Sequence, residues 1–115
     1  MRNTILIVDD SLFNRQMLCD ILKGKYELIE ASDGQEAMDI IEKQREKIAA
    51  ILLDVVMPNM DGVTLLKLLN EKKYLEFFPV LMVTGENSFE ILAECFKYGA
   101  SDYIRKPVQK DFVTE

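Results

Sequence analysis

Three short runs of almost uninterrupted apolar residues constrain the fold of this chain more than any other feature: Thr4–Asp9 (TILIVD), Ala49–Asp54 (AAILLD) and Pro79–Thr84 (PVLMVT). Strands that are apolar on both faces are typical of a parallel sheet covered by helices on either side. Two less apolar runs, Tyr26–Glu30 and Asp102–Arg105, are predicted to be edge strands. The sequence therefore predicts five parallel strands in an α/β domain.

The segments between these strands carry apolar residues every three or four positions, which is typical of amphipathic helices. Right-handed crossovers between parallel strands would place such helices on both faces of the sheet. We expect them at Leu12–Lys23, Gly34–Lys47, Gly62–Lys73 and Phe89–Tyr98, with a further helix starting at Gln109–Glu115.

The apolar stripe of the first helix supports this prediction. In the first helix, Phe13, Met17 and Ile21 form a stripe that we expect to face the core, with Leu18 and Leu22 beside it.

The helix ends carry capping residues. Asp33 with Glu36 predicts a capping pair for the second helix, and Ser88 predicts an N-cap for the fourth. Gly24 and Gly99 are typical helix stops.

Composition excludes several classes of function. The chain has 115 residues, enough for one core, and a net charge of −6, which argues against nucleic-acid binding by this chain alone. It contains no histidine, which excludes a Ser-His-Asp triad, histidine-ligated zinc and a phosphorylated histidine on this chain. No run approaches the roughly 18 apolar residues of a membrane span and the start does not resemble a signal peptide, so we expect a cytoplasmic protein. Cys19 and Cys95 lie far from any metal-binding spacing and are expected to be buried, reduced thiols.

Polar, chemically active side chains follow four of the predicted strands. Asp9 and Asp10 end the first, Asp54 ends the third, Thr84 ends the fourth, and Lys106 follows the fifth. In an open parallel sheet, ligands bind outside the carboxyl ends of the strands, so these side chains should converge at one edge.

Three carboxylates in one place repel one another unless a cation compensates them. Oxygen ligands without histidine or cysteine favour a hard ion, and Mg²⁺ pairs readily with phosphate oxygens. With Mg²⁺ bound, Asp54 could attack phosphorus to form an aspartyl phosphate. The Lys106 ammonium would neutralise phosphoryl oxygens, and Thr84 would supply a hydroxyl to one of them.

These residues closely resemble the response-regulator receiver domain of two-component signalling, over nearly the whole chain. The matching segments are ILIVDD, LLDVVMPNMDG, PVLMVTGE and SDYIRKPV, in the family's order and spacing. The resemblance implies a doubly wound, flavodoxin-like fold with strand order 2-1-3-4-5. It also implies that the phosphoryl donor is a histidine kinase or a histidine phosphotransfer protein, which agrees with the absence of histidine here.

The resemblance assigns a role to each matching residue. It implies that Asp9, Asp10 and Asp54 hold Mg²⁺ together with the backbone carbonyl of Val56, and that Asp54 is the phosphoacceptor. Thr84 and Lys106 would contact the phosphoryl group.

Further positions are assigned in the same way. Tyr103 would be the switch aromatic that turns inward when Thr84 moves, changing the surface of the fourth helix, fifth strand and fifth helix. Lys106-Pro107 resembles the family's cis peptide. Independently, Pro58 and the Asp61-Gly62 pair are typical of a turn, in which Gly62 would adopt backbone angles that other residues avoid.

Functions of two other classes are alternatives to a receiver domain. A flavodoxin-like carrier or a small Mg²⁺-dependent phosphatase is disfavoured, because DDSLFN lacks a phosphate-cradling glycine and the chain leaves little room for a substrate-gating segment. A phosphorylation-independent interaction module with a vestigial acidic pocket stays open as the alternative.

The end of the chain suggests a short last helix. Eight residues follow Pro107, enough for about two helical turns. We expect a single receiver domain, excised from a longer protein or cut within its last helix, in which Val108 and Phe112 leave an apolar strip that favours homodimer formation.

Overall fold

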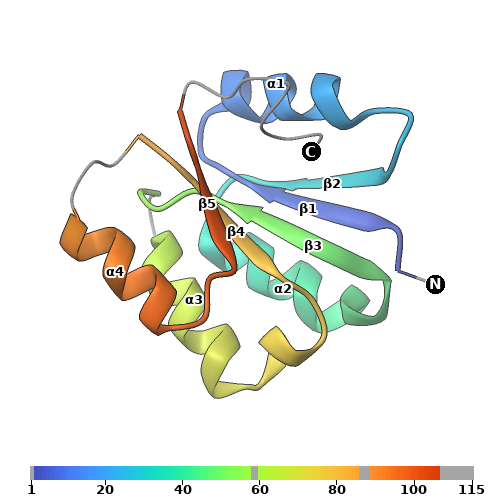
Figure 1. Ribbon diagram of the computed structural model, residues 1–115. Helices are drawn as coiled ribbons and strands as arrows, with labels where there is room; N and C mark the ends of the chain where they lie inside the picture. The colour runs from blue at the N-terminus through green and yellow to red at the C-terminus, as the bar shows by residue number, and fades with distance from the viewer. Residues whose placement is uncertain (1, 58–59, 86–88, 107–115) are drawn as a thin grey trace.

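The computed structural model describes residues 2–57, 60–85 and 89–106 of the chain. Within them lies one five-stranded parallel sheet with strand order β2-β1-β3-β4-β5 (Figure 1). The strands are β1 (Thr4–Val8), β2 (Glu27–Ala31), β3 (Ile48–Leu53), β4 (Val80–Thr84) and β5 (Asp102–Arg105). Every strand end lies within one residue of its predicted position, and the two less apolar strands are the edges, as expected.

Helices cover both faces of this sheet. Figure 1 shows α1 on one face and α2, α3 and α4 on the other, which confirms the doubly wound arrangement. The helices are α1 (Leu12–Leu22), α2 (Gly34–Gln44), α3 (Gly62–Glu71) and α4 (Phe89–Lys97), with single 3₁₀ turns at Arg45–Lys47 and Tyr74–Glu76. The helix expected at Gln109–Glu115 lies outside the described residues.

Alternation along the central strands divides the core into two clusters. Leu6 and Val8 of β1 point into the larger cluster, whereas Ile5 and Ile7 point into the smaller one beneath α1. Because both faces of the central strands are buried, the apolar runs in the sequence are nearly continuous.

The predicted core face of α1 was wrong in part. Leu18 and Leu22 are the buried residues of this helix, while Met17 and Ile21 are half-buried and Phe13 is 69% exposed. Helical side chains lean toward the helix N-terminus, so a residue in the first turn of α1 extends past the end of the sheet instead of packing on it.

The predicted capping pair and glycine stops agree with the structure, although α2 ends at Gln44 and α3 at Glu71, before the predicted Lys47 and Lys73. The Asp33 side chain accepts a hydrogen bond from the Glu36 amide at 2.8 Å, and Glu36 Oε1 accepts one from the Ser32 amide at 2.6 Å. Gly24 and Gly99 have φ of +84° and +107°, the left-handed conformation that ends a helix. Ser88 lies outside the described residues.

Both cysteines are free thiols, with Cys95 buried and Cys19 half-buried. Burial raises the pKa of each thiol, so both stay protonated at neutral pH. In the described ranges no helix has the length and apolar character needed to cross a bilayer.

Candidate functional site

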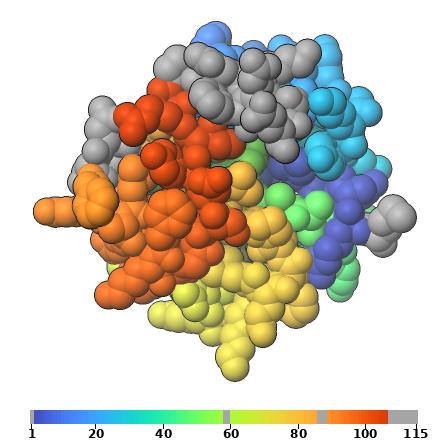
Figure 2. All heavy atoms as spheres, viewed as in Figure 1, coloured from blue at the N-terminus to red at the C-terminus, as the bar shows by residue number. Residues whose placement is uncertain are grey.

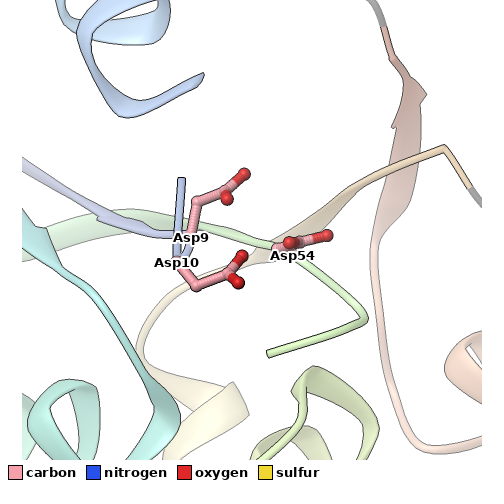
Figure 3. A group of neighbouring side chains, drawn as sticks. All are labelled: Asp9, Asp10 and Asp54. Atoms are coloured by element: carbon pink, nitrogen blue, oxygen red, sulfur yellow. The ribbon is translucent and has the colours of Figure 1, made fainter. Parts of the chain in front are cut away.

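Three carboxylates meet where β1 and β3 end. Asp9 and Asp10 directly follow β1, and Asp54 directly follows its neighbour β3 (Figure 3). One carboxylate oxygen from each residue lies within 4.8 Å of the other two. Asp9 and Asp54 are buried and Asp10 is exposed, so the cluster has one open side. The convergence expected from the sequence is therefore present.

Lys106, the residue after the edge strand β5, joins the carboxylates. Its amide donates a hydrogen bond to the Thr84 carbonyl at 2.9 Å, which ties the end of β5 to the end of β4. Its ammonium Nζ lies 3.1 Å from Asp9 Oδ2 and 3.3 Å from Asp54 Oδ1. One lysine therefore bridges the two buried carboxylates.

The lysine does not balance the negative charge. Burial, followed by the charge of Asp9, raises the pKa of Asp54 from 3.8 to about 6, despite the opposing attraction of Lys106. Burial alone would lower the pKa of Lys106, but the charges of Asp54 and Asp9 outweigh it, and the net shift is upward. The site is therefore short of positive charge.

The buried oxygens of this site suit a hard cation. Asp9 Oδ1 accepts a hydrogen bond from the Ser11 amide at 2.9 Å. Asp9 Oδ2 is ion-paired with Lys106 but, among the described residues, accepts no hydrogen bond of good geometry. Asp9 Oδ2 is therefore a buried carboxylate oxygen that can still accept a ligand. Together with the two other carboxylates it fits Mg²⁺, which takes oxygen ligands.

Thr84 and Tyr103 lie on the same face of neighbouring strands. Tyr103 pairs with Met82 in the β4–β5 register, and Thr84 follows Met82 by two residues. Thr84 is buried, whereas Tyr103 is 37% exposed and packs edge-on against Phe96 of α4, with ring centroids 6.0 Å apart. In Figure 2, α4 and β5 (orange and red) form one continuous surface on the viewed side.

The loop after β3 corrects the argument for Gly62. Gly62 is the first residue of α3 and does not have a positive φ, so it is not needed for unusual backbone angles. A Cβ there would overlap the carbonyl oxygen of Asp54 and lie 2.9 Å from its carbonyl carbon. Gly62 is required because the start of α3 passes directly against the backbone of Asp54.

The remaining predicted positions are placed only in part. Val56 lies in the loop two residues after Asp54, and its side chain is 66% exposed. Pro58 and Pro107 lie outside the described residues.

Sequence reasoning missed two residues beside the site. Arg15 of α1 donates a hydrogen bond from Nη1 to the Asp9 carbonyl at 2.6 Å and another from Nε to Glu30 of β2 at 3.0 Å. Arg15 precedes the buried Leu18 and Leu22 by three and seven residues, so it lies on their face of the helix. A charged residue on a buried stripe was the available signal.

The chain belongs to the response regulator receiver domain family, because the sequence model of that family matches residues 5–115. Receiver domains are phosphoacceptor modules of two-component signalling, they interact with histidine kinases or phosphotransfer proteins, and they bind Mg²⁺ at an acidic pocket. The resemblance drawn from the sequence motifs is thus confirmed.

Particular relatives agree with this assignment. The chain is 32% identical to the rice two-component response regulator ORR3 over 111 residues, covering 96% of this chain and 84% of that protein. It is 40% identical to the transcriptional regulatory protein SrrA of Staphylococcus aureus, but spans only 43% of it. Among solved structures, it is similar to CheY of Borrelia burgdorferi in a CheX-CheY-BeF₃-Mg²⁺ complex, with a TM-score of 0.89, 31% identity, and coverage of 96% of this chain and 83% of that one.

Proposed function

We propose that this chain accepts a phosphoryl group on Asp54 from a phosphohistidine of a partner protein, in a reaction that requires Mg²⁺. The observation that carries the proposal is the position of the Lys106 ammonium, 3.1 Å from Asp9 and 3.3 Å from Asp54, inside a cluster of three carboxylates. An arrangement that only stabilised the fold would be expected to balance its charges.

In this proposal the metal is held by oxygen atoms of the two loops. Asp9, Asp10 and Asp54 would supply carboxylate oxygens, and Val56 would supply its backbone carbonyl. The three carboxylates and Lys106 carry a formal charge of −2, from −3 and +1. When bound, Mg²⁺ would bring this sum to zero and neutralise charge on the transferring phosphoryl group.

The residues of the chain would then carry out the transfer. An oxygen of Asp54 attacks phosphorus, and the bond from phosphorus to the imidazole nitrogen of the donor breaks, with its electron pair returning to that nitrogen. Lys106 stabilises the negative charge of the phosphoryl oxygens, and the Thr84 hydroxyl donates a hydrogen bond to one of them. The open side of the site, at Asp10, is where the donor would enter.

The partner is a histidine kinase or a histidine phosphotransfer protein. This chain contains no histidine, so the donor imidazole must lie outside it. We propose that the chain and this partner meet in the cytoplasm.

The output is a change in the surface of α4 and β5. Thr84 and Tyr103 share one face of neighbouring strands, so movement of Thr84 toward a phosphoryl group would leave space for the Tyr103 ring. Burial of Tyr103 would remove it from Phe96 and alter the surface in Figure 2. Phosphorylation would thus shift the population between two surfaces.

The test is incubation of the chain with acetyl phosphate and Mg²⁺, followed by intact mass spectrometry. We expect one added phosphoryl group, which is lost when EDTA replaces Mg²⁺ and absent in Asp54→Asn. Asp61→Asn is the matched control: Asp61 caps α3 by accepting a hydrogen bond from the Thr64 amide at 2.8 Å, and asparagine caps equally well. This variant should be modified like the wild type.

The same experiment addresses the alternative of a phosphorylation-independent interaction module. If the wild-type chain stays unmodified by acetyl phosphate and by a phosphorylated histidine kinase while remaining folded, the acidic pocket is vestigial and the proposal fails.

A further inference from the structure

We propose that Arg15 is a positioning residue for the acidic site: it fixes the peptide between Asp9 and Asp10 and so sets the directions of both carboxylates. This inference rests on the proposed function, because it concerns how the chain would hold Mg²⁺. It concerns a residue outside the acidic cluster itself.

Every hydrogen-bonding group of Asp9 except one carboxylate oxygen is held in place. Its amide donates to the Ala31 carbonyl of β2 at 3.1 Å, and its carbonyl accepts from Arg15 at 2.6 Å. Its Oδ1 accepts from the Ser11 amide at 2.9 Å. Oδ2 alone is left to face Lys106 and a cation.

The contact with the Asp9 carbonyl also acts on Asp10. The peptide group is planar, so the direction of the Asp9 carbonyl fixes the plane that contains the amide and Cα of Asp10. Asp10 is exposed, and its position would otherwise depend on a loop end with one side in solvent. Arg15 therefore acts on both carboxylates through one backbone oxygen.

Arg15 is itself held by β2. Its side chain is only 14% exposed, and its Nε pairs with Glu30 Oε1 at 3.0 Å. Glu30 lies opposite Ile7 in the β1–β2 register, one residue before the end of the strand pair. Because the guanidinium is planar and rigid, fixing Nε on Glu30 also fixes the direction of Nη1 toward Asp9. The edge strand and α1 thus jointly brace the acidic loop.

Positioning by Arg15 and simple electrostatics predict opposite changes in Mg²⁺ affinity when Arg15 is replaced. Arg15→Met removes a positive charge near a cation site, which by Coulomb attraction alone would tighten Mg²⁺ binding. Loss of positioning would weaken it instead. Removing the partners that orient metal ligands typically weakens binding by about 10-fold to 100-fold, and we expect about 10-fold here.

The experiment is isothermal titration of Mg²⁺ into wild type, Arg15→Met and Arg2→Met, with the unfolding free energy of each measured in EDTA. Arg2 is the matched control, because its Nη1 donates to two carbonyls, Arg45 at 2.7 Å and Ile48 at 2.9 Å, at the opposite end of the strands. Both variants lose one arginine and its carbonyl contacts. Only Arg15→Met should lose Mg²⁺ affinity, even if both variants are less stable than wild type.

Each outcome decides the question. If folded Arg15→Met binds Mg²⁺ as tightly as wild type, or more tightly, Arg15 is purely structural and the inference is wrong. If Arg15→Met does not fold, Arg15→Lys decides: it keeps the charge but not the rigid fork, so weaker binding supports positioning and wild-type binding overturns it. If wild type itself binds no Mg²⁺, the proposed function fails and this inference with it. If wild type binds Mg²⁺ and Arg15→Met binds it equally well, only the inference about Arg15 fails.

Discussion

The Asp54 carboxylate lies 3.3 Å from the Lys106 ammonium, yet its pKa is raised to about 6. A close cation ordinarily lowers the pKa of a carboxyl group. Here burial and the charge of Asp9 outweigh the attraction of Lys106. Without a metal, the ionised form of Asp54 is therefore a source of instability.

This relationship predicts that the metal-free protein loses stability as the pH rises from about 4 to about 7. The pKa of Asp54 is 3.8 when unfolded and about 6 when folded, so in this range the folded state binds more protons and stability falls with rising pH. The shift of about two units corresponds to about 3 kcal/mol at neutral pH. Urea unfolding in EDTA at several pH values measures it.

Asp54→Asn isolates the contribution of this one group. In EDTA at pH 7 the variant should be at least as stable as wild type, because the buried charge is gone. Well below pH 3.8, where Asp54 is protonated in both states, the advantage should vanish. A stability difference between variant and wild type that stays constant across this pH range would contradict the raised pKa.

Lys106→Met should raise the pKa of Asp54 further. The variant removes the attraction that opposes burial and Asp9, and an opposite charge within about 4–6 Å is typically worth about 1–3 units. The measurement is titration of the Asp54 carboxyl carbon by NMR in EDTA. Lys67→Met serves as control, because Lys67 pairs with Glu94 at 3.2 Å, between α3 and α4, and among the described residues no ion pair joins it to the acidic cluster. An unchanged Asp54 pKa in Lys106→Met would refute the charge balance described above.

The strands and the acidic cluster were predictable because both depend on simple periodicities. A strand buried on both faces has a nearly continuous apolar run, and parallel topology brings the residues after β1, β3, β4 and β5 to one edge. The face of α1 was less predictable. Two apolar stripes adjoin on that helix, and periodicity alone does not say that Leu18 is buried while Phe13 is exposed.

Contacts that depend on three-dimensional neighbours were missed for a different reason. Arg15 and Glu30 are 15 residues apart and meet only because β2 pairs with β1 beneath α1. The need for glycine at position 62 is predictable but its cause is not: the sequence shows a glycine after an aspartate and cannot show the backbone of Asp54 against it.

Gly62→Ala should destabilise the protein by about 3 kcal/mol or more, because its Cβ would overlap backbone atoms of Asp54 that cannot move without displacing the end of β3. Gly85→Ala is the matched control, since a Cβ there meets none of the described residues within 4 Å. Urea unfolding of both variants provides the comparison. If Gly62→Ala is as stable as Gly85→Ala, the close approach of α3 to β3 is not present in solution.

The last prediction concerns transmission from Asp54 to α4. Addition of Mg²⁺ and beryllofluoride, a phosphoryl analogue, should shift the NMR signals of Glu90, Lys97 and Tyr103, because Tyr103 would leave its edge-on contact with Phe96 as Thr84 moves. The coupling must favour the phosphoryl-bound surface, typically by about 1–3 kcal/mol in allosteric proteins. Asp54→Asn with the same reagents should show none of these shifts. If signals move around Asp54 in wild type while those of α4 and β5 stay fixed, phosphorylation would not reach this surface, and the switch would have to lie elsewhere in the domain.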